Sequence, residues 1–264
     1  MKLGISTASF FNRIPTESAF DVLRQMKVDV TEVFLNSYYE YDKQFVDALV
    51  PRRGNISVHS VHSLSTQFEP QLFSDNPRVL ADAENMFRKV CYAAYVLGAK
   101  FYTFHGPTRL KKHDNDFDYA KLAVKINRIT DIAQSMGVNV SYENVHWTYS
   151  SFPEYFKQIL KLCPQLYATL DFKQAIQGGE DPYKFMDAMN GRISTVHLCD
   201  VDKEGKTALP GNGKLNLEKI FRELDRREIN APVLIEVYSG DYKDLNELEY
   251  NYNYVREVMS SSMK

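Results

Sequence analysis

The chain has 264 residues, of which 44% are hydrophobic and 25% are charged, and 32 Lys and Arg against 34 Asp and Glu give a formal charge of −2. This apolar fraction excludes a disordered chain, and the near-zero charge removes the general electrostatic argument for nucleic-acid binding. At about 150 residues per domain, the length permits two modest domains or one large α/β barrel.

Eight short runs rich in β-branched residues predict strands along the chain. Their starts lie 26 to 44 residues apart, which leaves room for one strand, one helix and two loops each time. The predicted strands are residues 3–7, 30–35, 56–62, 100–105, 138–143, 167–171, 193–198 and 233–237.

Helical patterns fill the intervals between these runs. The pattern at 77–97 ends before Gly98 and that at 119–136 ends before Gly137, and glycine is the residue expected just past a helix end. Asn216 is a suitable N-cap for a further helix. The predicted helices are residues 16–26, 77–97, 119–136, 152–162 and 217–227.

Regular alternation of strand and helix predicts a parallel sheet with right-handed crossovers. Eight such units match the length of a (β/α)₈ TIM barrel, so we predict an α/β protein in which residues 1–264 form a single barrel domain. A doubly wound open sheet is the alternative, but the first turn, STASFFNR, has no GxGxxG motif.

The cysteines and the N-terminus bear on location. Cys91, Cys163 and Cys199 are scattered and never form a CxxC pair, which fits a reducing compartment. The start, MKLGISTASFF, lacks the features of a signal peptide, and no stretch approaches the ~20 apolar residues that cross a bilayer. We expect a soluble cytoplasmic protein that has neither a membrane nor a nucleic acid as partner; the oligomeric state stays open, a homo-oligomer included.

Ionisable residues gather near the ends of the predicted strands, where TIM barrels build their active sites. Histidines end the third strand (His59 and His62) and the fourth (His105), whereas His113 lies outside the strands. Because His59 and His62 are an odd number of residues apart, His59 is expected to point to the opposite side of the barrel wall and to be structural.

Four successive strands each carry one ligand-type residue late in an apolar run: Glu143, Asp171, His197 and Glu236. Alone, each has an ordinary explanation, such as a hydrogen-bonded histidine or an aspartate that caps the next helix. Together, three carboxylates and one imidazole at one mouth would repel and be costly to bury without a counter-charge. This set predicts one divalent metal ion, with Mn²⁺, Mg²⁺, Zn²⁺ and Co²⁺ as candidates.

These residues and their neighbours resemble the xylose-isomerase-like barrels. The superfamily includes ketose 3-epimerases, hydroxypyruvate isomerases, inosose dehydratases and type IV apurinic endonucleases. The resemblance runs over nearly the whole chain and rests on KLGIST (2–7), HGP (105–107), YEN (142–144), TLDF (169–172), VHLCD (196–200), LPGNGKLN (209–216) and LIEVYS (234–239).

The resemblance implies that the four residues ligate the metal and that Glu143 and Glu236 also act as an acid–base pair. The implied activity is isomerisation or epimerisation of a sugar, sugar phosphate or polyol through a cis-enediolate. It also implies that His62 and His105 face the carbohydrate substrate or a second metal.

Two positions depart from the family pattern or extend it. Gln174 stands where the family often has histidine, and its amide is expected to hydrogen-bond a hydroxyl or phosphate of the substrate. Trp147, just past Glu143, is expected to stack on a sugar face, with ordinary loop packing as the alternative.

The segment 201–213, VDKEGKTALPGNG, has no histidine and offers only Lys203 and Lys206 where many epimerases have an arginine. A trinuclear cluster of the endonuclease kind therefore cannot be assembled in the same way. An apurinic-site phosphodiesterase and a non-catalytic polyol-binding relative are the alternatives to the isomerase.

Overall fold

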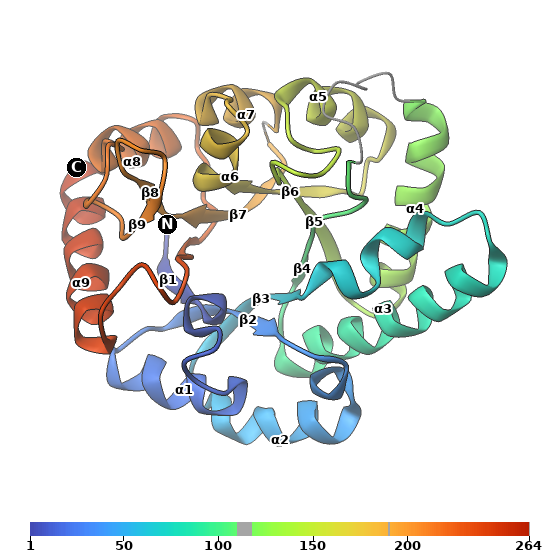
Figure 1. The fold of residues 1–264 in the computed structure, drawn as a ribbon, viewed down its shortest axis with the longest axis horizontal. Helices are drawn as coiled ribbons and strands as arrows, with labels where there is room; N and C mark the ends of the chain where they lie inside the picture. The colour runs from blue at the N-terminus through green and yellow to red at the C-terminus, as the bar shows by residue number, and fades with distance from the viewer. Residues whose placement is uncertain (110–117, 190, 264) are drawn as a thin grey trace.

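Eight parallel strands close into a barrel in the computed structural model, which describes residues 1–109, 118–189 and 191–263 (Figure 1). Around the barrel the strands follow the order β1-β10-β7-β6-β5-β4-β3-β2, and every neighbouring pair is parallel. The predicted TIM barrel is therefore confirmed. His113 lies outside the described residues.

The barrel strands agree with the predicted runs to within two residues at each end. They are β1 (Leu3–Ser6), β2 (Val30–Leu35), β3 (Ser57–Ser63), β4 (Phe101–Phe104), β5 (Asn139–Glu143), β6 (Tyr167–Asp171), β7 (Ile193–Leu198) and β10 (Val233–Ile235). Two short strands, β8 (Asp200–Val201) and β9 (Thr207–Ala208), form a separate antiparallel hairpin directly after β7.

α-Helices surround the barrel (Figure 1). Five of them match predicted helices to within one residue at each end: α1 (Thr16–Gln25), α3 (Pro77–Leu97), α4 (Tyr119–Ser135), α5 (Pro153–Leu162) and α8 (Leu217–Arg226). The pattern did not predict α2 (Lys43–Arg53), α6 (Phe172–Gln177), α7 (Pro182–Ala188) or α9 (Leu245–Ser262). Short 3₁₀ turns occupy η1 (Thr7–Phe10), η2 (Tyr38–Tyr41), η3 (Ser65–Gln67) and η4 (Glu69–Phe73).

Local capping explains where the long helix α3 begins and ends. The Asn76 side chain accepts a hydrogen bond from the backbone N–H of Arg78, with Pro77 in the first turn, where its missing N–H costs nothing. Gly98 ends the helix in the left-handed conformation, at φ +78°. Between these ends the helix buries Phe87, which packs against Tyr102 of β4.

One orientation prediction is wrong, because β3 contains a bulge. Its register with β2 shifts so that Val58 lies opposite Thr31 and Ser60 opposite Glu32, which leaves His59 as an extra residue. The His59 ring crosses the barrel interior to β7, where Nε2 lies 2.9 Å from the backbone oxygen of Ser194. His59 thus points into the barrel, although at a different level from His62.

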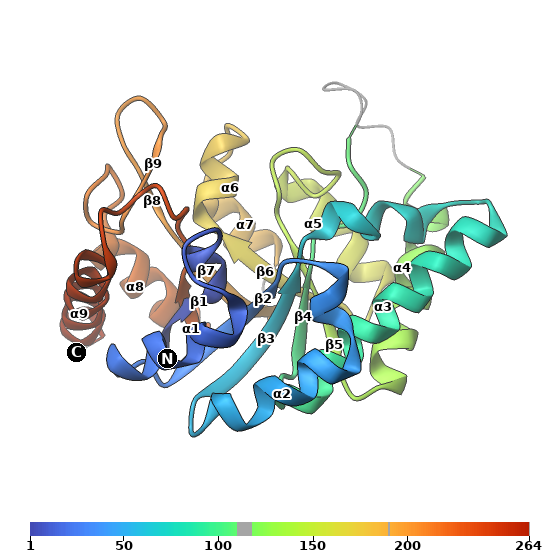
Figure 2. The ribbon, with the colours of Figure 1, turned by 60° about the horizontal axis from the view of Figure 1, so that its bottom comes forward.

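The carboxyl ends of the strands open on one side of the barrel. In Figure 2 the β8–β9 hairpin and α6 rise on this upper side, while the N-terminus lies on the lower side. Across the described ranges, no helix combines the length and apolar character needed to cross a membrane.

Candidate active site

Four predicted ligands meet at the mouth of the barrel. Glu143 ends β5, Asp171 ends β6, His197 lies one residue before the end of β7, and Glu236 directly follows β10. All four are buried, with Asp171 and His197 at 0% exposure and Glu236 at 8%. One ligand atom from each lies within 4.8 Å of the others, so the structure brings this set together.

The geometry fits a divalent cation. Nδ1 of His197 lies 3.4 Å from Oε1 of Glu143, 3.5 Å from Oε2 of Glu236 and 3.8 Å from Oδ2 of Asp171. Ligands about 2.1 Å from a tetrahedral cation are about 3.4 Å apart, close to these distances. His197 Nδ1, Asp171 Oδ2 and Glu236 Oε2 are buried and have no hydrogen-bond partner within the described residues. Buried polar atoms of this kind call for an ion or another partner.

Each ligand points one atom at the cluster and another at a supporting group. Oδ1 of Asp171 accepts the backbone N–H of Gln174 at 2.8 Å and so caps α6, while its Oδ2 faces the cluster. The helix-cap explanation is therefore confirmed for Oδ1 of Asp171, and Oδ2 is the oxygen that remains available for the predicted role as a metal ligand. Asn144 fixes the strand end, because its amide exchanges two 2.8 Å hydrogen bonds with the backbone of Asp171.

Mutual repulsion and burial perturb the carboxyl groups of the cluster. Burial, with the charges of Glu143 and Glu236, raises the pKa of Asp171 to about 7 against the opposing charge of Lys173. Burial also raises the pKa of Glu236. The pKa of Glu143 falls well below its usual range despite burial, because His105 and His197 favour the ionised form. A bound cation would offset this concentration of negative charge.

Glu32, a fully buried residue of β2 beneath the cluster, is not among the site residues predicted from the sequence. Its Oε1 lies 3.2 Å from Nε2 of His197, on the side of the ring opposite the three carboxylates. Burial by itself would raise the pKa of Glu32, but the charges of His197 and His62 together with the hydrogen bond from Thr103 leave that pKa below its usual range. The signal was present, since Glu32 is a lone charge in the apolar run VTEVFL.

Lys173 is a second residue that the sequence did not single out. It lies in α6, two residues after Asp171, with a side chain only 3% exposed. Its ammonium nitrogen lies 3.8 Å from Oδ2 of Asp171 and 3.8 Å from Oε1 of Glu236. The same nitrogen lies 4.8 Å from the ring centre of Tyr238. Lys173 therefore places a positive charge against one edge of the cluster.

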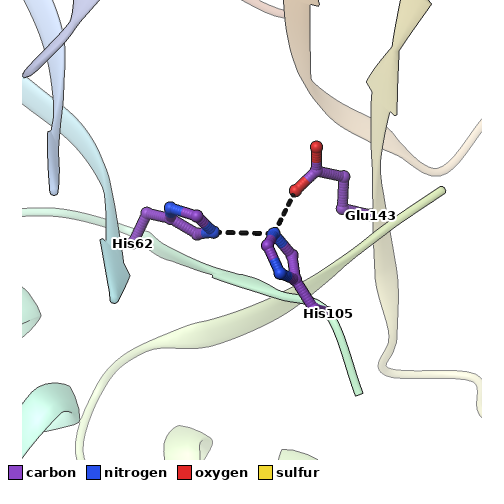
Figure 3. A group of neighbouring side chains, drawn as sticks. All are labelled: His62, His105 and Glu143. Carbon is purple, nitrogen blue, oxygen red and sulfur yellow. Dashed lines mark hydrogen bonds and ion pairs between the residues drawn. The ribbon is translucent and has the colours of Figure 1, made fainter. Parts of the chain in front are cut away.

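His62 and His105 form a second group of ligand-type residues with Glu143 (Figure 3). Their Nε2 atoms are 2.8 Å apart, and Nε2 of His105 lies 2.7 Å from Oε2 of Glu143. Burial lowers the pKa of His62 to about 3, whereas Glu143 raises the pKa of His105 against the effect of burial. His105 directly follows β4, and Glu69 of η4 holds it in place by accepting its backbone N–H at 2.8 Å.

A cavity of about 290 Å³ opens above these groups. The four residues predicted to face the substrate line this cavity: His62, His105, Trp147 and Gln174. The rest of the polar and aromatic lining comprises Glu143, Glu236, Lys173, Phe11, Phe34 and Tyr238. This volume is at the lower end for small-molecule sites. The hairpin residues Lys203 and Lys206 are exposed and are not part of the lining.

Gln174 is oriented by its neighbour His146. The Gln174 carbonyl oxygen accepts the backbone N–H of His146 at 3.2 Å and lies 2.6 Å from its ring Nδ1. With that oxygen engaged, the part of Gln174 suited to contact a ligand is its NH₂ group, a donor.

Comparison with known proteins shows the family of the chain. Residues 20–258 match the family described as the xylose isomerase-like TIM barrel. The chain belongs to this family. The xylose isomerase-like barrel accounts for nearly the whole length of the chain, and the resemblance read from its sequence motifs is confirmed.

Three known proteins are similar to the chain. An inosose dehydratase of Clostridium perfringens is 24% identical over 156 residues, which cover 52% of this chain and 52% of that protein. The chain thus spans about half the length of the inosose dehydratases it matches. The solved structure of an IolI protein with a bound zinc atom has a TM-score of 0.82, 16% identity and 99% coverage of both chains. A D-tagatose 3-epimerase-like protein has a TM-score of 0.79, 18% identity and full coverage of both chains. At these identities the two structures demonstrate a shared fold.

Proposed function

We propose that the protein is a divalent-metal-dependent isomerase or epimerase of a sugar, sugar phosphate or polyol. The observation that carries the proposal is that the two carboxylate oxygens of each glutamate face different groups. Glu143 turns Oε1 toward the ligand cluster and Oε2 toward His105, while Glu236 turns Oε2 toward the cluster and Oε1 toward Lys173. Each glutamate can therefore hold a cation with one oxygen and exchange a proton with the other.

One carboxylate would accept the proton from the carbon beside the substrate carbonyl, which leaves a cis-enediolate. The other, already protonated from solvent, would then deliver its own proton to the opposite face or to the neighbouring carbon. Bound to the cluster, a divalent cation would polarise the substrate oxygens and stabilise the negative charge that develops on them. The raised pKa of Glu236 suits a group that accepts a proton near neutral pH.

The remaining lining residues bind and orient the substrate. His62, His105 and the NH₂ group of Gln174 supply polar contacts to hydroxyl groups, and Trp147 supplies a flat apolar face. The relatives lend support, since one is an inosose dehydratase and another a D-tagatose 3-epimerase-like protein. Both names concern polyhydroxylated ketones, the substrate class that this combination of donors and one aromatic face suits.

The test is a metal analysis followed by a screen of ketoses, ketose phosphates and cyclic polyol ketones for incorporation of solvent deuterium. We expect one bound divalent ion per chain and deuterium at a carbon beside the carbonyl. Glu143→Gln and Glu236→Gln should abolish incorporation while circular dichroism reports a folded barrel. Glu40→Gln is the control, because Glu40 accepts hydrogen bonds in η2 away from the cavity. Full incorporation in both site variants would refute the acid–base roles.

An apurinic-site phosphodiesterase is the second candidate, favoured by the group His62, His105 and Glu143 as a place for another cation. Against it, the two Nε2 atoms are 2.8 Å apart, closer than the about 3.4 Å between ligands of one tetrahedral cation. Incision of a duplex with a single abasic site by the metal-loaded protein is the direct assay, and cutting there would overturn the isomerase proposal.

A further inference from the structure

Glu32 and His197 form a buried pair at the centre of the barrel. The His197 ring has its Nδ1 toward Glu143, Asp171 and Glu236 and its Nε2 3.2 Å from Oε1 of Glu32. We infer that Glu32 is a positioning residue, which keeps the His197 proton on Nε2 and so presents the unprotonated Nδ1 to the cation. This inference rests on the metal site of the proposed function.

A histidine ligates a metal ion as a neutral imidazole. A neutral ring carries one N–H, and only the other nitrogen has a lone pair for a metal. Glu32 offers an acceptor at Nε2 and nothing that could donate to it, because an ionised carboxylate only accepts. The proton is therefore favoured on Nε2. Carboxylates that accept the second N–H of a ligating histidine fix its tautomer and raise its basicity.

Glu32 is itself held from three other strands. Its Oε2 accepts hydrogen bonds from Ser60 of β3 at 2.7 Å and Thr103 of β4 at 2.5 Å, and its Oε1 accepts one from Ser6 of β1 at 3.3 Å. The donors from Ser60 and Thr103 occupy Oε2, so Oε1, which accepts only the longer bond from Ser6, is the oxygen directed at His197. A carboxylate fixed in this way fixes the ring plane of the histidine above it.

The burial of Glu32 is hard to explain as packing alone. TIM-barrel interiors are filled mostly by branched apolar side chains, yet this position holds a carboxylate with 0% exposure. A buried charge is costly even when paired, and apolar replacements are often neutral or stabilising. The need to orient the His197 ring explains why a charged residue occupies position 32.

The first test compares Zn²⁺ affinity in wild type and Glu32→Gln by chelator competition at one pH. The amide keeps the shape and one acceptor oxygen but loses the charge, so we expect affinity to fall about 10- to 100-fold. The visible spectrum of the Co²⁺-loaded variant should also change, which lost stability alone would not cause. Glu40→Gln is the control: it makes the same substitution at a carboxylate that accepts hydrogen bonds from Thr16 and Asn36 and does not line the cavity. We expect it to leave the affinity at the four-residue site unchanged.

A second measurement needs no variant at Glu32 and decides the question if Glu32→Gln does not fold. In the Zn²⁺-loaded wild type, ¹⁵N shifts of the His197 ring, assigned by its loss in His197→Asn, should locate the proton on Nε2. A proton on Nδ1, or equal Zn²⁺ affinity in Glu32→Gln and wild type, would overturn the inference. A wild type that binds no divalent ion would instead refute the proposed function, so the two failures are distinguishable.

Discussion

The ammonium group of Lys173 lies 3.8 Å from Oε1 of Glu236, on the lining of the cavity. Lys173 is itself almost fully buried and also faces Asp171. With the proposed divalent cation bound, the three carboxylates would leave one negative charge at the cluster, which Lys173 would offset. The charge of Lys173 also lowers the pKa of Glu236 against the larger effect of burial.

Lys173→Met should therefore raise the pKa of Glu236 and move the acid limb of the pH–rate profile to higher pH. Two unit charges at this distance interact by about 4 kcal/mol at an effective dielectric of 20, so a shift of about one pH unit is a modest expectation. The measurement is the pH dependence of deuterium incorporation. Lys173→Arg keeps the charge and should keep the wild-type profile. Identical pH–rate profiles for Lys173→Met and wild type would contradict the conclusion that the charge of Lys173 lowers the pKa of Glu236.

The raised pKa of Asp171 makes the metal-free protein sensitive to pH. In the folded chain this carboxyl titrates at about 7 rather than at 3.8, so it holds a proton that the unfolded chain releases between those values. The contribution of Asp171 to the free energy of unfolding is therefore largest below about pH 4 and is lost as the pH rises toward 7. Divalent metal should offset the loss, because the cation replaces the proton.

The measurement is the thermal unfolding midpoint with and without Zn²⁺ at pH 5 and pH 8. We expect the metal to raise the midpoint more at pH 8, and calorimetry at pH 6 in buffers of different ionisation enthalpy should detect proton release on binding. Asp171→Asn removes the titrating group and should flatten the pH dependence without metal. An equal effect of metal at both pH values would count against the shifted pKa.

The proximity of the four clustered residues could be predicted because each interrupts an apolar strand near its end, and the barrel brings strand ends together. Glu32 carries the same signal in VTEVFL, yet it lies in the middle of its run, away from the strand ends at which TIM barrels build their sites. Lys173 gave no signal, because a lysine two residues past a strand is normally solvent-exposed. Lys173 faces the cluster because α6 starts directly after Asp171 and directs the lysine side chain toward Asp171 and Glu236.

The pattern of alternation fails where the backbone departs from a regular pleat. His59 points inward because the bulge in β3 adds a residue, and bulges leave no mark in a hydrophobic pattern.

The helix α2 has only Val46 and Leu49 fully buried and contains Pro51, so it lacks the apolar stripe that identified α3. Packing against α3 and α1 stabilises it instead.

Trp147 closes one side of the cavity beside His105, with their rings 5.7 Å apart and nearly perpendicular. If it stacks on the substrate, Trp147→Ala should raise KM about tenfold, since an aromatic contact contributes about 0.5–1.5 kcal/mol beyond burial. The value of kcat should change little, because Trp147 carries no group that moves a proton. Trp147→Phe should recover most of the affinity. A fall in kcat at unchanged KM would assign the residue to positioning His105 instead.

Asp200 holds the loop that follows β7 and His197. Its buried carboxylate accepts four backbone N–H groups, from Val201, Gly211, Gly213 and Leu215, at 2.8 to 3.0 Å. Asp200→Ala leaves these donors without their acceptor, so we expect a loss of about 1–3 kcal/mol in the free energy of unfolding by urea. Asp202→Ala is the control: Asp202 caps the exposed hairpin turn, and its removal should cost less because water can replace it. Equal losses in the two variants would mean that the hairpin turn, and not the buried carboxylate, limits the stability of this loop.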